Sequence, residues 1–395
     1  MITDFARDGL LDLPWWGVML AALLMTHFTI IAVTLYLHRH QAHRALSLHP
    51  AVAHVFRAWL WLTTGMSTKG WTAVHRKHHA FVEQAGDPHS PQVFGIKKVF
   101  FEGAELYREA VNDPATLAKY GHGTPEDWLE QHVYSRLTIH GVALMLLLDL
   151  LLFGVLGLTV WAVQMIWIPL FAAGVINGLG HWRGYRNFET QDGSTNLLPW
   201  GLLIGGEELH NNHHAFATSA RFSMRPWEFD IGWAYIRGLE LLGLASVKRV
   251  VRAPMVDAGK SSVDLETLRA VVASHVHVLA DYARRVVYRV HQDEVAGAPK
   301  AERHELRPLK RLIPRADHRL GERERAYLRD GLSKSRALAT VYEFQQRLLM
   351  LFSERQASQE RLLQSLQEWC EAAEATGIAA LEEFARRLAG YRLVA

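Results

Sequence analysis

Residues 206–214 read Gly-Glu-Glu-Leu-His-Asn-Asn-His-His, and the last five of them form the pattern His-x-x-His-His. Residues three and four positions apart lie on one face of a helix, so this pattern can direct three imidazoles at one metal cluster. The same pattern occurs once more, at residues 75–79. A chain with 22 histidines among 395 residues rarely produces it twice by chance. The repetition indicates a histidine-rich metal site rather than two polar helix faces.

The composition limits what can bind such a metal. The chain has one cysteine, Cys370, which excludes an intrachain disulfide, a four-cysteine zinc site and a plant-type iron–sulfur cluster. The ligands must therefore be imidazole, carboxylate or amide groups, and imidazole suits iron, zinc, copper and nickel alike. The net charge of +3 gives no sign of a nucleic-acid partner, and we expect none.

Apolar segments predict an integral membrane protein. Residues 14–37 are almost continuously apolar and long enough to cross a bilayer as one helix. Residues 137–176 are long enough for two more helices with a turn near 154–159. Residues 51–68 are shorter and interrupted by a histidine and an arginine, so we interpret them as an interfacial helix. We expect an all-α fold with about three spanning helices.

Basic residues predict the orientation of these helices. Residues 38–133 carry ten arginines and lysines, whereas the opposite side has Arg7 and an uncharged turn. The positive-inside rule then places the histidines in the cytoplasm and the N-terminus outside. The sequence therefore predicts a multi-pass protein of the inner (cytoplasmic) membrane, with a helical cap that carries the metal site on the cytoplasmic side.

Two further pairs of polar residues adjoin the apolar segments. His38 and His43 follow the first apolar segment and are five residues apart. Five residues turn an α-helix through one full turn and about 140° more. We therefore expect the two side chains to flank a site rather than lie on one face of the helix. Asn177 and His181 end the last, at positions i and i+4 of a helix. The candidate ligands are His38, His43, His75, His78, His79, His181, His210, His213 and His214, with Asn177 as a polar neighbour.

The composition changes near residue 255. Residues 255–395 are rich in Ala, Leu, Glu and Arg, in a pattern typical of amphipathic helices. We expect a membrane domain over residues 1–254 and a soluble helical region of unknown role over residues 255–395. This tail is faintly similar to the C-terminal helical part of certain insertion-sequence transposases, around 335–344 and 369–391. No acidic catalytic set is evident there, so no activity is inferred from the similarity.

Nine imidazoles are too many for one ion that keeps an open position, but they suit two ions. A two-metal, imidazole-rich site beside a membrane fits iron-based activation of O2 on a lipid. Zinc-dependent hydrolysis is an alternative, because Glu207 and Glu208 precede His210 and one of them could act as a base. A membrane-docked helical binding protein with a vestigial metal site is a third hypothesis.

The histidine segments resemble the three histidine boxes of the membrane fatty acid desaturases. These are His38-Arg39-x-x-x-His43, His75-Arg76-x-His78-His79 and His210-Asn211-Asn212-His213-His214. Their surroundings resemble the Δ9 branch of that family, namely Asp87-Pro88-His89, Asn177-x-x-x-His181, Gly184-Tyr185-Arg186 and Gly206-Glu207. The resemblance implies a helical cap over the spanning helices and nine histidine ligands on two irons. It also implies that Asn177 reaches one iron through water, with Asp87 and Glu207 as possible partners of the ligands.

The resemblance further implies a reaction. Such an enzyme uses O2 and two electrons to convert a saturated acyl chain into a cis-monounsaturated one. Animal acyl-CoA enzymes of the family have an Arg-Asp pair before the second box, where this chain has Ala73-Val74. That departure favours a bacterial-type enzyme acting on phospholipid, with acyl-CoA desaturation or lipid hydroxylation as alternatives. No cytochrome b5 module is evident, so electrons are expected from an external ferredoxin or flavoprotein reductase.

Overall fold

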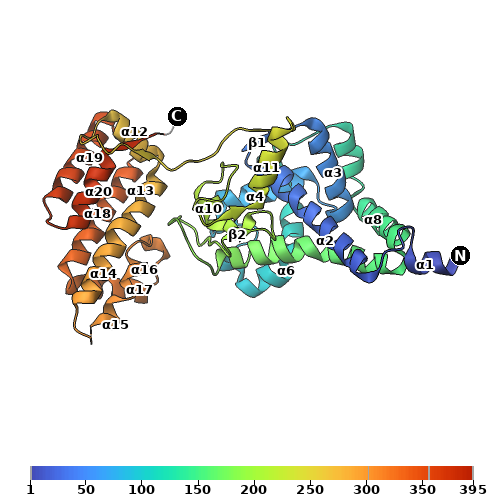
Figure 1. Ribbon diagram of the computed structural model, residues 1–395, viewed down its shortest axis with the longest axis horizontal. Helices are drawn as coiled ribbons and strands as arrows, with labels where there is room; N and C mark the ends of the chain where they lie inside the picture. Colours follow the sequence, from blue (N-terminus) through green and yellow to red (C-terminus); the bar gives the residue numbers. More distant parts are fainter. Residues whose placement is uncertain (1, 301, 355, 394–395) are drawn as a thin grey trace. The chain divides into compact units, whose positions relative to one another are not determined.

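The computed structural model describes residues 2–300, 302–354 and 356–393, and these residues are mostly helical (Figure 1). The chain divides into two compact units. The first comprises residues 1–186 and 192–251, and the second comprises residues 187–191 and 252–395. A short segment within the histidine-bearing half therefore folds with the C-terminal region.

The first unit contains all the histidine boxes. Its α-helices are α1 (Ile2–Asp8), α2 (Trp15–Ala32), α3 (Pro50–Thr64), α4 (Thr68–Phe81), α5 (Pro91–Phe94), α6 (Ile96–Val111), α7 (Pro114–Tyr120), α8 (Thr138–Phe153), α9 (Gly157–Ile168), α10 (His210–Ala215) and α11 (Ile231–Leu241). Its other helical segments are the π-helices η1 (Val33–Ala42), η2 (Glu130–Tyr134) and η4 (Pro169–Ile176), and the 3-10 turns η3 (Gly154–Leu156), η5 (Leu179–His181) and η6 (Glu207–Leu209). Its strands are β1 (Leu46–Leu48), β2 (Trp200–Gly201), β3 (Phe229–Asp230) and β4 (Ala245–Val247), which pair as β1 with β4 and β2 with β3.

Two helical stretches of the described chain are long and apolar enough to cross a membrane, Trp15–Ala42 and Thr138–His181. The second has 44 residues and turns back on itself at Gly154, whose φ of +60° is accessible to glycine at little cost. The resulting helices α8 and α9 pack against each other, and α2 packs against α9. These features associate the protein with a membrane.

Polar side chains inside these apolar helices bond to other helices. The carboxylate of Asp149 accepts a hydrogen bond of 2.8 Å from Gln164. His27 lies 2.8 Å from the hydroxyl of Tyr235 and contributes to neither histidine group. Both contacts join different helices, so they position the helices rather than a substrate.

Helix α3 is too short to cross a bilayer, as its sequence indicated. The Trp59 indole donates to Thr29 of α2, and the Trp61 indole donates to the Leu137 carbonyl, just before α8. Gly65 ends α3 with a φ of +63°, and α4 begins three residues later with the second histidine box. Contacts to α2 and α8 thus fix the start of the helix that carries this box.

The expected α-helical spacing of His38 and His43 is wrong. His38 lies in η1 and His43 directly follows it, and the His43 N–H bonds to the His38 carbonyl at 3.0 Å, five residues back. A π-helix closes its hydrogen bonds over five residues, so side chains five apart lie on one face. The two imidazole rings accordingly lie 4.9 Å apart. Asn177 also follows a π-helix, η4, and a turn at Gly178 separates it from His181.

The second unit has its own apolar core. Its helices are α12 (Leu265–Ala273), α13 (His275–Tyr282), η7 (Ala283–Val287), α14 (Tyr288–Gly297), α15 (Arg303–Leu306), α16 (Leu309–Leu312), η8 (Asp317–Arg319), α17 (Glu322–Lys334), α18 (Arg336–Ser353), α19 (Gln359–Glu374) and α20 (Ala379–Ala389). Strands β5 (Met255–Val256) and β6 (Tyr391–Arg392) pair with each other. Trp369 and Phe384 are buried in this core beside Tyr282, so the tail folds as a helical bundle.

Candidate metal centre

All nine histidines singled out from the sequence come together in two groups in the first unit. The ligating nitrogen atoms within each group lie within 4.8 Å of one another. The first group has five members, His38, His43, His75, His79 and His213. The second has four, His78, His181, His210 and His214. Five and four imidazoles match two ions, each with room for oxygen ligands.

Each of the two His-x-x-His-His boxes contributes to both groups, whereas His38 and His43 of the first box both join the five-histidine group. On α4, His75 and His79 belong to the five-histidine group, whereas His78 belongs to the four-histidine group. On α10 the arrangement is reversed, because His210 and His214 join the four-histidine group and His213 joins the other. Residues i and i+4 of a helix project together, while residue i+3 projects to one side of them. The pattern His-x-x-His-His therefore serves two neighbouring sites at once.

The nitrogen geometry fits metal ions. Glu207 lies 2.7 Å from Nδ1 of His38, and Glu83 lies 3.2 Å from Nδ1 of His181. An ionised carboxylate only accepts, so each Nδ1 donates its proton and Nε2 is left with a lone pair. Yet Nε2 of His38 lies 3.1 Å from Nε2 of His213.

The same occurs in the other group, where Nε2 of His181 lies 3.0 Å from Nε2 of His210. In each pair the partner nitrogen can fill the gap by donating a proton, or both nitrogens can direct their lone pairs at one cation. Two nitrogens each about 2.1 Å from one metal and at right angles would be about 3.0 Å apart. The histidine nitrogens therefore have the spacing of ligands on a common ion.

The imidazoles are in the form that binds metals. Burial, followed by the charge of neighbouring imidazoles, lowers the pKa of a set of ligand candidates, His43, His75, His79, His210 and His213. Burial lowers the pKa of His214 to about 4, even though Asp192 partly opposes the shift. Neutral imidazoles offer lone pairs to a metal. Within the described residues, buried Nε2 atoms of His78 and His214 also have no hydrogen-bond partner.

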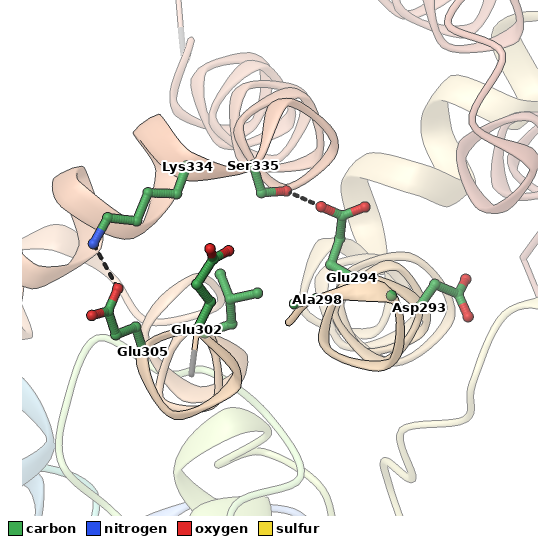
Figure 2. Close-up of a pocket in the computed structure, with 9 residues that line it drawn as sticks. Asp293, Glu294, Ala298, Glu302, Glu305, Lys334 and Ser335 are labelled. Atoms are coloured by element: carbon green, nitrogen blue, oxygen red, sulfur yellow. Dashed lines mark hydrogen bonds and ion pairs between the residues drawn. The ribbon is translucent and has the colours of Figure 1, made fainter. Parts of the chain in front are cut away.

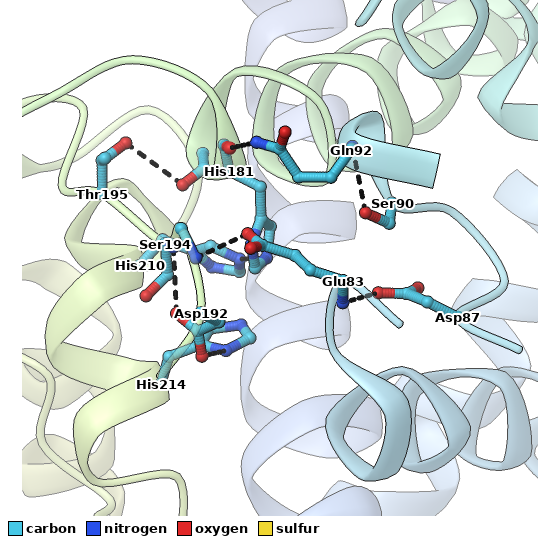
Figure 3. Close-up of polar contacts among 12 residues, drawn as sticks. Glu83, Asp87, Ser90, Gln92, His181, Asp192, Ser194, Thr195, His210 and His214 are labelled. Atoms are coloured by element: carbon cyan, nitrogen blue, oxygen red, sulfur yellow. Dashed lines mark hydrogen bonds and ion pairs between the residues drawn. The ribbon is translucent and has the colours of Figure 1, made fainter. Parts of the chain in front are cut away.

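Four carboxylates accept hydrogen bonds from Nδ1 of a histidine, which we call the outer nitrogen because Nε2 faces the other imidazoles. Besides Glu207 on His38 and Glu83 on His181, Asp87 lies 3.0 Å from Nδ1 of His78 and Asp192 lies 3.1 Å from Nδ1 of His214. Figure 3 shows Glu83 beside His181 and Asp192 beside His214. Such carboxylates fix the ring orientation and raise the basicity of a metal ligand.

Sequence reasoning identified Asp87 and Glu207 but missed Glu83 and Asp192. Neither of the missed residues has a telling spacing from the histidine that it contacts, because 98 and 22 residues separate the partners. Sequence reasoning also gave no role to His89, which is buried with its ring 4.5 Å from that of His78. Burial and the charge of His78 lower the pKa of His89 to about 3.

A cavity of about 910 Å³ opens on the histidines. Among its lining residues are His38, His75, His78 and His210, together with Asn177 and Glu207. Much of the remaining lining is apolar and comes from α2, α8, α9 and η4, including Ile30, Val142, Met165, Ile168 and Ile176. Its volume is typical of small-molecule sites. The cavity can therefore hold an apolar ligand against the imidazoles.

The second unit has a smaller and more polar cavity of about 360 Å³ (Figure 2). Four carboxylates line it, those of Asp293, Glu294, Glu302 and Glu305. Lys334 pairs with Glu305 at 2.7 Å, and the Ser335 hydroxyl donates to Glu294 at 2.5 Å. These contacts neutralise part of the acidic wall and explain its local arrangement.

Comparison with known proteins identifies the chemistry of the first unit. The family model for fatty acid desaturases matches residues 13–239, more than half of the chain. The chain belongs to the fatty acid desaturase family. This desaturase is 32% identical to the acyl-CoA 5-desaturase AL21 of Anemone leveillei, over 60% of this chain and 73% of that protein.

Two other relatives have similar coverage. The desaturase is 30% identical to the Delta-9 acyl-lipid desaturase 1 of Arabidopsis thaliana, over 58% of this chain and 75% of the relative. It is also 30% identical to the sn-1 stearoyl-lipid 9-desaturase of Synechocystis sp., over 58% and 71%. The protein is thus an oxidoreductase that desaturates fatty acyl chains, a reading favoured over hydroxylation and over zinc-dependent hydrolysis.

A second family model, named Transposase, matches residues 260–393 of the desaturase. This match covers nearly the whole C-terminal helical region and agrees with the faint similarity seen in its sequence. The desaturase family match ends at residue 239. The two matches therefore fall on different parts of the chain.

Proposed function

We propose that this desaturase introduces a cis double bond, of the Δ9 type, into saturated acyl chains carried by membrane phospholipid. The observation that carries the proposal is the apolar cavity that opens on two groups of histidines. The reaction consumes O2 and two electrons, which an external ferredoxin or flavoprotein reductase would supply.

The substrate assignment rests on two further observations. Two of the relatives are named as 9-desaturases of acyl lipids, whereas another is named as an acyl-CoA desaturase. In addition, Ala73 and Val74 are buried apolar residues just before the second box. They offer no charge to a CoA head group, which favours phospholipid over acyl-CoA.

We assign one iron to each histidine group. His38, His43, His75, His79 and His213 would hold the first, and His78, His181, His210 and His214 would hold the second. Asn177 lies on the cavity wall with His78 and His210, and we assign it to the second iron through a water molecule. Iron bound in this way supplies the oxidising power to remove hydrogen from an unactivated methylene group, which no side chain can do.

The protein's own side chains orient and shield this chemistry. Asp87, Glu207, Glu83 and Asp192 hold the rings of His78, His38, His181 and His214 by accepting from their outer nitrogens. Apolar side chains from α2, α8, α9 and η4 exclude water from the methylene chain in the cavity. A saturated chain offers no polar group for recognition, so the shape of the cavity must decide which carbons face the histidines.

The proposal includes a topology. We propose three spanning helices, one from Trp15–Ala42 and two from the hairpin of α8 and α9. The remaining helices of residues 1–254 form a cytoplasmic cap with the di-iron site, in the inner membrane. Residues 255–395 form a separate helical domain without ligands. The excess of basic residues between 38 and 133 supports this orientation.

Two single substitutions test the ligand assignment. His78→Ala should remove a nitrogen from the four-histidine group, and His213→Ala from the five-histidine group. Each variant should lose measurable desaturation and about half of its iron, since a different iron is affected in each. His40→Ala is the matched control, because the His40 ring faces the Leu46 carbonyl and belongs to neither group. Unchanged iron content with full activity in both ligand variants would contradict the assignment.

Analysis of intact lipids tests the substrate. After expression in cells that lack the activity, new double bonds should occur at Δ9 in phospholipid-bound chains before they occur in the acyl-CoA pool. If new double bonds appeared first in acyl-CoA, the substrate would be acyl-CoA rather than phospholipid. A hydroxyl group in place of a double bond would select hydroxylation.

A further inference from the structure

The segment of residues 187–191 folds with the C-terminal unit, although it lies between two histidine boxes in the sequence. Phe188 is only 2% exposed, and its ring lies edge-on to that of His277 at 5.3 Å. His318 donates to the Gln191 carbonyl at 2.8 Å, and Arg319 lies 3.8 Å from Glu189. A buried ring, a hydrogen bond and an ion pair thus hold five consecutive residues inside the second unit.

The residue that follows this segment belongs to the metal centre. Asp192 accepts from Nδ1 of His214 at 3.1 Å through one oxygen, and from the Ser194 N–H at 2.9 Å through the other. Arg186 precedes the segment and donates to the Asp192 and Ser194 carbonyls at 3.1 and 2.5 Å. Figure 3 shows Asp192 and Ser194 next to His214. The anchored segment therefore ends one peptide bond before the side chain that orients a histidine.

We propose that the C-terminal unit controls metal binding at the four-histidine group, by fixing the segment 187–191 and through it the positioning residue Asp192. Adjacent Cα atoms are 3.8 Å apart, so anchoring Gln191 narrows the backbone conformations open to Asp192. His214 needs that carboxylate to direct its Nε2 inward. The proposal rests on the proposed function only in treating the four histidines as a metal site.

The five-histidine group provides an internal reference. In this group His38 has a carboxylate partner, Glu207. Glu207 lies outside the anchored segment. Loosening of residues 187–191 should therefore affect one group and spare the other. A general loss of folding would affect both groups together. This difference separates control through Asp192 from simple instability.

Titration of the full-length, metal-free protein with Co²⁺ tests the proposal. Cobalt bound by histidine nitrogens has a visible absorption spectrum, and the wild-type chain should bind two equivalents. In Phe188→Ala, and in the milder His318→Ala, one equivalent should bind as in wild type and the other about 10- to 100-fold more weakly. Asp192→Asn should give the same selective loss with the C-terminal contacts intact.

Phe384→Ala is the matched control, because Phe384 is equally buried in the core of the second unit but packs against Tyr282 and Trp369. It should bind both equivalents as long as circular dichroism shows a folded chain. Wild-type affinity at both groups in Phe188→Ala and His318→Ala would overturn the proposal, as would equal weakening of both groups. Because cobalt binding is measured without turnover, a failed substrate assignment would leave this result unaffected, whereas a wild-type chain that binds no cobalt would overturn both proposals.

Discussion

At the scale of single residues, the hydrogen bond made by the outer nitrogen of a histidine affects metal binding as well as the inner Nε2 that would bind the ion. Burial raises the pKa of Glu207, but its interaction with His38 and the charge of Arg39 outweigh the burial and lower the pKa. Glu207 is therefore an anion at neutral pH, and it also accepts from Thr34 at 2.8 Å. An anion at this position makes His38 a stronger donor of its Nε2 lone pair.

We predict that Glu207→Gln weakens metal binding at the five-histidine group by about 10-fold or more. Glutamine keeps the shape and can still accept from His38, so the loss reports the missing charge. Cobalt titration measures the effect, and desaturation activity should fall with it. Glu105→Gln, at an exposed ion pair on α6, is the control and should change neither. Equal affinity in Glu207→Gln and wild type would show that the carboxylate charge has no role in binding.

The nine histidines could be predicted from sequence because their spacing is local and repeated. Glu83 and Asp192 could not, because their histidine partners are 98 and 22 residues away and only the tertiary fold joins them. A lone carboxylate in a loop is ordinarily solvated, so its presence in the sequence does not indicate a buried histidine partner. The partition of the histidines into groups of five and four is also a tertiary property, set by the facing of α4 and α10.

At the scale of elements, the π-helices η1 and η4 differ most from the sequence-based expectation. The apolar pattern of 14–37 predicted a helix but not its widening at Val33, since hydrophobic spacing does not distinguish four-residue from five-residue hydrogen bonding. The wider turn is what aligns His38 with His43. Another π-helix, η4, leads into Asn177 and packs closely on α6. Helix existence was thus predictable, whereas the local winding that positions the site was not.

The contact between α6 and η4 gives a prediction. A Cβ atom added at Gly103 would lie 2.8 Å from Cβ of Ala173, so Gly103→Val should force η4 away from α6. We expect a loss of stability of about 1–3 kcal/mol and lower desaturation activity, because Ala173 and Asn177 line the cavity. Thermal unfolding in detergent and lipid analysis measure the two effects.

Gly238→Val is the matched control for this change. Gly238 also lies in a helix, α11, but a Cβ atom added there would meet nothing within 4 Å. Its substitution by valine should leave both unfolding temperature and activity near wild type. Similar losses in the two variants would mean that helix propensity, rather than the close contact of α6 with η4, explains the result.

At the scale of the whole molecule, the sequence predicted two regions with different chemistry, and the chain does form two compact units. The sequence did not predict that residues 187–191 fold with the second unit rather than with the first. Those residues include Phe188, which reads in the sequence as an ordinary loop aromatic. Which core receives such a side chain depends on packing between segments far apart in the chain. The sequence prediction of two regions rests on the composition change near residue 255.

We predict that the histidine boxes and the C-terminal unit lie on the same side of the membrane. A periplasmic reporter fused after residue 90 or after residue 262 should be inactive, because both positions follow an odd number of crossings in the proposed topology. The same reporter fused between α8 and α9, at residue 155, should be active. Activity after residue 90 would mean that α3 crosses the bilayer, and the shared metal centre would then need another explanation.

The crossing of His78 and His213 into the opposite groups has a consequence for the motion of the two helices. Both α4 and α10 offer imidazoles to both groups, so two bound ions would hold each helix at two points. Local opening of either helix would then require its side chains to leave both ions. Amide hydrogen exchange should accordingly slow in α4 and α10 together when the protein is loaded with metal.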